Sequence, residues 1–115
     1  MTTRAAGDPG AGIETAIRRA VDPSRLLTGE DPATQQPDEA RRWLELYAEL
    51  LTVVAPILES LRSSMVGMSA QAVEELNDTE LVLLERQVSR LRARLQYWGH
   101  RSQELAETIS RRPSA

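Results

Sequence analysis

The sequence predicts an all-α protein, built as an antiparallel helical hairpin or coiled coil with a flexible N-terminal segment. Aromatic residues make up only 3% of the 115 residues and Phe is absent, whereas cores that contain sheets usually use more large rings. Apolar residues recur at steps of three and four in two long stretches. That spacing is the period of a helix with one apolar face.

The first stretch predicts a helix over residues 38–66. Asp38 follows a proline and has the short polar side chain that caps helix N-termini. We expect the aromatic residues of this stretch to pack in the core rather than to lie exposed. The apolar seam consists of Trp43, Tyr47, Leu50, Val54, Ile57, Leu61 and Met65.

The second stretch predicts a helix over residues 78–111, with Asn77 and Asp78 as its cap. Its seam alternates steps of three and four over four heptads, which is typical of a coiled coil. Two long helices joined by a short connection make an antiparallel hairpin. Because one hairpin buries little apolar surface, we expect a homodimer or a partner complex. The seam consists of Leu81, Leu84, Val88, Leu91, Leu95, Trp98, Ser102, Leu105 and Ile109.

Residues 1–37 are expected to be disordered or only loosely docked. Within them, residues 13–21 favour a short helix, since their apolar positions share one face. Residues 28–37 contain a glycine and two prolines and are interpreted as a linker. We expect residues 112–115 to form a tail.

Composition excludes several kinds of site. There is no cysteine and only one histidine, His100, so disulfides, thiolate metal sites and cysteine nucleophiles are excluded. No apolar run approaches the roughly 20 residues of a membrane span, and the first residues lack an apolar signal core, so we expect a cytoplasmic protein. We find no catalytic constellation, phosphate loop or metal motif and predict that the chain is not an enzyme. All 14 basic residues are Arg, a bias that is typical of proteins encoded by GC-rich, actinobacterial-type genomes.

Charge is distributed unevenly along the chain. Residues 1–84 carry 14 acids and 7 Arg, for a net charge of −7, whereas residues 86–101 carry 5 Arg and no acid. The whole chain has a net charge of −3. A mildly acidic protein with one basic helical segment favours a local anionic partner over direct binding to nucleic acid.

A row of polar residues accompanies the second seam. Its first four members each follow a seam residue by one position, so they lie along one flank of the helix. The row can bind a ligand through hydrogen bonds, or it can be a solvated coiled-coil flank, where these residue types are common. Its members are Glu85, Ser89, Arg92, Gln96 and His100.

The stretch LVLLERQVSRLRARLQYWGH resembles the signature of RsiG-type anti-sigma factors, which bind cyclic di-GMP. That signature is Glu, three residues, Ser, two, Arg, three, Gln, three, Asp, on a coiled-coil helix. Glu85, Ser89, Arg92 and Gln96 match it in type and spacing, and His100 stands where the family has Asp.

The resemblance implies a non-enzymatic regulator with cyclic di-GMP as its ligand and a sigma factor as its protein partner. An Arg fork can bond guanine O6 and N7, and a carboxylate can accept from guanine N1–H and N2–H. The first long helix has no copy of the pattern, so the resemblance also implies that two chains supply the site. The alternative is a scaffolding hairpin that mediates oligomerisation without a small ligand.

Overall fold

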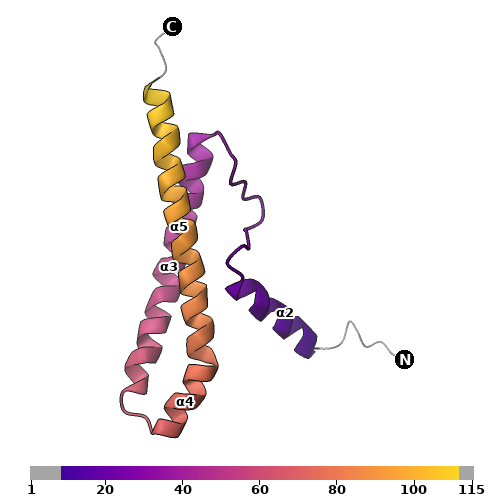
Figure 1. The fold of residues 1–115 in the computed structure, drawn as a ribbon, viewed down its shortest axis with the longest axis vertical. Helices are drawn as coiled ribbons and strands as arrows, with labels where there is room; N and C mark the ends of the chain where they lie inside the picture. The colour runs from indigo at the N-terminus through magenta and orange to yellow at the C-terminus, as the bar shows by residue number, and fades with distance from the viewer. Residues whose placement is uncertain (1–8, 112–115) are drawn as a thin grey trace, which may run out of the picture.

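The computed structural model describes residues 9–111, and this part of the chain contains four helices and no strand. They are α2 (Pro9–Val21), α3 (Pro37–Met65), α4 (Ala70–Asp78) and α5 (Glu80–Ser110). In Figure 1, α3 runs toward α4 and α5 returns alongside it. None of the helices within residues 9–111 is both long enough and apolar enough to cross a membrane.

The first long helix starts one residue before its predicted beginning and ends one residue before its predicted end. Pro37 lies in its first turn and Gln36 is the N-cap. Proline suits this place because the N–H that it lacks would have no partner inside the helix. Asp38, the predicted cap, therefore lies inside the first turn, where its charge favours the positive end of the helix dipole.

The predicted start of the second long helix at Asn77 and Asp78 is wrong, because these residues end α4. Thr79 interrupts the helix with φ −124° and ψ −95°, and its hydroxyl donates to the Glu75 carbonyl at 2.8 Å. Ser69 caps the start of α4, since its hydroxyl accepts from the backbone N–H of Ala72 at 3.3 Å. The sequence of Asn77 and Asp78 suggested a helix start because Asn and Asp are common both at helix N-caps and in turns.

The two seams meet between α3 and α5, as predicted for the core. The Trp43 and Trp98 rings stack there with their centroids 6.5 Å apart. The buried apolar residues are Ala40, Trp43, Tyr47 and Leu58 from α3, and Val88, Leu91, Trp98 and Leu105 from α5.

Two residues of the predicted seams are exposed. Ile57 is 51% exposed and Ile109 is 47% exposed. Leu58 takes the place of Ile57, because it follows Ala40 by about five full turns at 3.6 residues per turn and so points the same way. Ile109 belongs to the end of α5.

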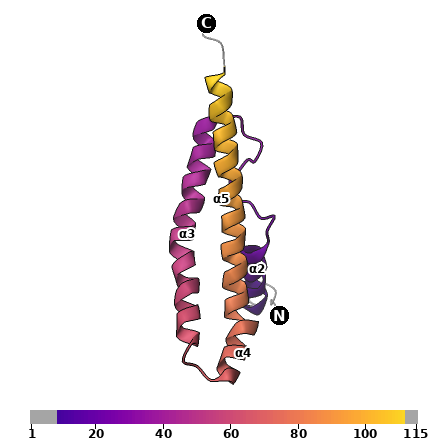
Figure 2. The same cartoon turned by 60° about the vertical axis from the view of Figure 1, so that its left-hand side comes forward.

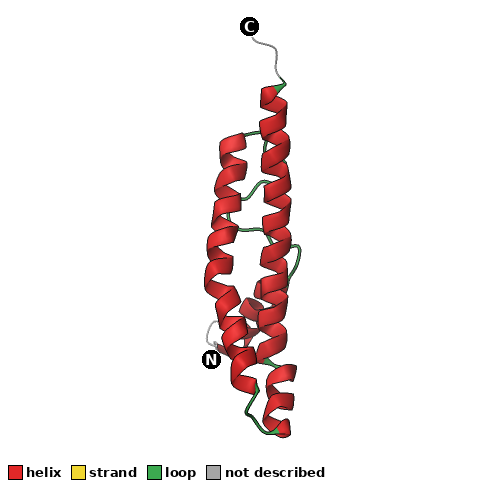
Figure 3. Ribbon diagram, turned by 90° about the vertical axis from the view of Figure 1, so that its left-hand side faces the viewer, coloured by secondary structure: helices red, strands yellow, loops and turns green. Residues whose placement is uncertain are grey.

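Residues 22–36, which we call the strap, connect α2 to α3. They were expected to be loosely docked, but Glu30 and Thr34 are buried. Figure 3 shows the strap crossing behind the α3–α5 pair, on the side that we call the strap face; the opposite side is the open face. The helix expected at 13–21 lies within α2, which packs against α5 (Figure 2). Residues 1–8 and 112–115 lie outside the described range.

Candidate functional site

Four of the five predicted row residues line a single groove on the open face. The groove has a volume of about 350 Å³ and lies between the second half of α3 and the middle of α5. Its walls are Leu58 and Arg62 from α3, and Glu85, Val88, Ser89, Arg92, Ala93 and Gln96 from α5. The row therefore shares its groove with residues of the other long helix.

The seam determines where the row lies. Val88 and Leu91 are buried against α3, and each residue that follows a seam position is turned by about 100° around the helix axis. This rotation brings Ser89 and Arg92 out of the core and onto the flank, where both are exposed.

His100 is not part of this groove. Its side chain is 79% exposed, and its Nε2 lies 4.0 Å from the Glu104 carboxylate. The groove ends at Gln96. His100, the one position that differs from the signature, therefore lies apart from the four residues that match it.

Arg62 is a residue of the groove that the sequence analysis missed. Its Nη2 lies 2.9 Å from Glu85 Oε2, and its Nη1 lies 2.7 Å from Glu59 Oε2. The hydrogen bond to Glu85, followed by that to Glu59, raises the pKa of Arg62 above its usual value. A signal was present: Arg62 follows the seam residue Leu61, as Glu85 follows a seam leucine. Predicting that Arg62 pairs with Glu85 would have required knowledge of the register of α3 against α5.

The groove combines opposite kinds of polar group over an apolar floor. Glu85 is an acceptor, Arg62 and Arg92 are donors, and Ser89 and Gln96 can act as either. Leu58 and Val88 are the apolar groups beneath them. A planar ligand with both donors and acceptors along its edge fits this chemistry. Within residues 9–111, no three His, Cys, Asp or Glu side chains gather closely enough to hold a metal ion.

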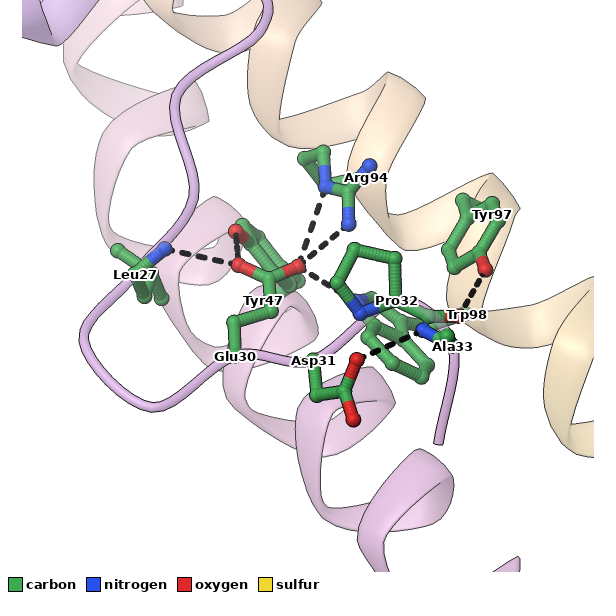
Figure 4. Close-up of polar contacts among 9 residues, drawn as sticks. All are labelled: Leu27, Glu30, Asp31, Pro32, Ala33, Tyr47, Arg94, Tyr97 and Trp98. Carbon is green, nitrogen blue, oxygen red and sulfur yellow. Dashed lines mark hydrogen bonds and ion pairs between the residues drawn. The ribbon is translucent and has the colours of Figure 1, made fainter. Parts of the chain in front are cut away.

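The strap face has a polar centre of a different kind, shown in Figure 4. The carboxylate of Glu30 accepts from the Tyr47 hydroxyl at 2.6 Å and the Leu27 N–H at 2.8 Å through Oε1. Its Oε2 accepts from Trp98 Nε1 at 2.7 Å and from Arg94 Nη2 at 2.5 Å and Nε at 3.2 Å. One loop residue therefore binds both long helices.

The Glu30 side chain is 0% exposed and that of Arg94 is 15% exposed. Burial alone would raise the pKa of Glu30, but the hydrogen bonds from Tyr47, Leu27, Trp98 and Arg94 outweigh it and hold this pKa below its ordinary value. Burial, followed by the hydrogen bond to Glu30, raises the pKa of Tyr47 to about 12. Both effects stabilise an ionised carboxylate beside a neutral phenol.

Further contacts hold the rest of the strap. The Tyr97 hydroxyl donates to the Pro32 carbonyl, and Arg101 Nη2 donates to the Thr34 carbonyl at 2.8 Å. Gly29 adopts φ +84°, a conformation that glycine accepts without strain. Glu30 could not be found from sequence periodicity, because a single acid in a loop has no period and its partners Arg94 and Trp98 lie 64 and 68 residues further along the chain.

Comparison of the chain with protein-family models, curated proteins and solved structures gave no significant match.

Proposed function

We propose that this chain is a non-enzymatic regulatory protein whose α3–α5 pair acts as an antiparallel hairpin and presents its open-face groove to cyclic di-GMP. The observation that carries the proposal is that Glu85, Ser89, Arg92 and Gln96 line one groove. These are the four residues that match the RsiG-type signature. As that resemblance implies, we propose a sigma factor as the protein partner.

The groove has suitable groups for guanine and phosphate. The Arg92 fork can donate to guanine O6 and N7, and Glu85 can accept from N1–H and N2–H. Arg62 can pair with a phosphate once a ligand occupies Glu85. This exchange costs little, because Arg62 and Glu85 are each 45% exposed and exposed ion pairs contribute only about 0–1 kcal/mol.

We also propose that two chains complete the site. One groove of about 350 Å³ is at the small end of ligand pockets, which commonly hold about 300–1,000 Å³. Cyclic di-GMP has two guanines, and α3 carries no second copy of the row. A homodimer would place two such grooves against one ligand.

The alternative is a scaffolding hairpin without a small ligand. The observation that favours it is the ion pair between Arg62 and Glu85, which already satisfies both groups. In addition, seam residues near α4 such as Leu61, Met65 and Leu81 are only half-buried. Association of chains through this end would bury them further.

Calorimetry with cyclic di-GMP distinguishes the two hypotheses. We expect saturable heat from the purified chain, loss of that heat in Arg92→Ala, and unchanged heat in Arg41→Ala, an exposed arginine of α3 outside the groove. Absence of heat at high micromolar ligand would contradict the nucleotide hypothesis and favour the scaffold. Light scattering tests whether the chain forms a dimer. A monomeric mass at every protein concentration would exclude the dimer.

A further inference from the structure

An apolar stripe runs along α3 on the side turned away from the open-face groove. Val53 is 61% exposed and Ile57 is 51% exposed, and they continue a row of half-buried leucines at helical steps. Val53 precedes Arg62 by about two and a half turns, so these two side chains point in opposite directions. Because Arg62 lines the open-face groove, the stripe faces away from it. The stripe consists of Leu46, Leu50, Val53 and Ile57.

α2 has an apolar face of its own that the chain leaves partly uncovered. Ile13 is 60% exposed and Ile17 is 38% exposed, and their spacing of four residues places them on one face of the helix. Figures 1 and 2 show α2 and α3 on opposite sides of α5, against which α2 packs. The α2 of a chain therefore does not cover the stripe of the same chain, and both faces remain exposed.

The end of the stripe nearest the strap opens into an acidic hollow of about 550 Å³. Its two carboxylates, Glu45 and Glu49, are exposed, and within residues 9–111 neither lies within 4.0 Å of an arginine nitrogen. Arg42 also lines the hollow, with its guanidinium carbon 5.4 Å from the centroid of the Trp43 ring. A helix that covers the stripe would gain from positive charge at this end. The lining residues are Thr28, Gly29, Arg42, Trp43, Glu45, Leu46 and Glu49.

α2 matches the stripe in spacing and in charge. Its two isoleucines are four residues apart, as are Val53 and Ile57. When the two helices run antiparallel, Ile17 packs on Val53 and the C-terminal end of α2 lies at the acidic hollow. Arg18 and Arg19 are in the last turn of α2, so this direction brings positive charge to the two carboxylates. Parallel helices would carry both arginines to the opposite end of the stripe.

We propose that the stripe is covered by α2 of a second copy of this chain, and that each copy docks its α2 on the stripe of the other. Each copy supplies one α2 and one stripe, so a two-fold axis pairs all four faces and leaves none open. A foreign partner could cover only one of the two faces with one helix. The contact does not involve cyclic di-GMP and leaves the open-face groove uncovered.

The test compares the self-association of the full chain, without nucleotide, with that of substituted chains. We expect a dimer by sedimentation equilibrium. Val53→Asp should weaken this dimer by about a hundredfold, because each lost apolar contact contributes about tenfold and the dimer contains two. Ile13→Asp alters the other side of the same contact and should have an equal effect. A chain that stays monomeric at high micromolar concentration, or a dimer that neither substitution weakens, would overturn the proposal.

Val66→Asp is the matched control. Val66 is 87% exposed at the end of α3 and lies outside the stripe, so this substitution should leave the dissociation constant within about twofold. A loss equal to that of Val53→Asp would place the contact near α4 and contradict the proposal. All three substituted positions are exposed, so circular dichroism should show the natural helix content for each chain.

Cysteine substitutions locate the contact, because the natural chain has no cysteine. When each variant carries one thiol, a disulfide between two different variants joins two chains. Under mild oxidation, we expect a mixture of Ile17→Cys and Val53→Cys to give mainly the mixed disulfide. A mixture of Ile17→Cys and Val66→Cys should give little of it. Equal yields from the two mixtures would contradict the docking of α2 on the stripe.

Discussion

Glu30 and Glu85 are both carboxylates bonded to an arginine of the long helix pair, but they lie on opposite faces of it. Glu30 is fully enclosed and accepts five hydrogen bonds. Glu85 has a side chain that is 45% exposed, and Arg62 is its ion-pair partner. The same chemical pair therefore holds the fold together on the strap face and remains accessible to a ligand on the open face.

The physical reason for this difference is the cost of exchange. Removing one partner of a buried, hydrogen-bonded pair leaves a charge without compensation and costs about 3–5 kcal/mol. An exposed pair exchanges its partner for water or a ligand at a cost of about 0–1 kcal/mol. A ligand can thus compete for Glu85 but not for Glu30.

The largest effect is expected from Glu30→Gln. An amide has one acceptor oxygen instead of two and leaves Arg94 without its counter-charge, so we expect the free energy of unfolding to fall by about 3 kcal/mol. Urea unfolding followed by circular dichroism measures this loss. Glu49→Gln, on the exposed side of α3, is the matched control and should change the free energy by less than about 0.5 kcal/mol. Equal effects would remove the contrast between buried and exposed acids.

A pair of alanine substitutions compares the packing at the two ends of the helix pair. Leu91 is 1% exposed, and Leu91→Ala should cost about 3 kcal/mol through the cavity that it leaves. Leu61 is only half-buried near α4, so Leu61→Ala should cost about 1 kcal/mol at low protein concentration. A larger cost for Leu61→Ala that grows with concentration would show that chains associate through this end.

The strap face should also respond to pH. The pKa of Tyr47 is raised from 10.0 to about 12, so the stability that it contributes is present below pH 10 and is lost between pH 10 and about 12. This loss is at most about 3 kcal/mol, and Tyr47→Phe should abolish the step. The pKa of Glu30 is lowered from 4.5, so its contribution is present above pH 4.5 and is lost as pH falls through the folded-state pKa. Unfolding experiments across pH measure both.

The smallest effect on stability is expected from Arg62→Gln on the open face. Both partners of its pair with Glu85 are 45% exposed, so the free energy of unfolding should stay within the error of the measurement. Under the proposed function, the same substitution weakens the binding of cyclic di-GMP, because it removes a cation from the groove. Unchanged affinity by calorimetry would show that Arg62 does not contact the ligand.

Periodicity predicted the parts of the molecule that repeat. The steps of three and four correctly indicated an all-helical chain with two long helices packed along their apolar sides. The same seam placed Ser89 and Arg92 on one flank, where the structure has them. Signals that depend on a single residue were less informative, as the misplaced cap at Asn77 and Asp78 shows.

Periodicity could not predict contacts that depend on the three-dimensional register. Glu30 reaches Trp98 across most of the chain, and no local pattern marks an acid that will be buried. The ion pair between Arg62 and Glu85 likewise depends on the axial register of α3 against α5. The sequence therefore predicted only the α5 side of the groove. The α3 wall of the groove and the docking of the strap were revealed by the structure.

The most direct test of the contrast between the two faces is to map cyclic di-GMP on the isotope-labelled full chain. The proposed function predicts saturable amide shifts at Ser89, Arg92 and Gln96, while the indole N–H of Trp98 keeps its hydrogen bond to Glu30 and does not move. A shift of that indole N–H, or the absence of any saturable shift on the open face, would contradict the assignment of ligand binding to the open face.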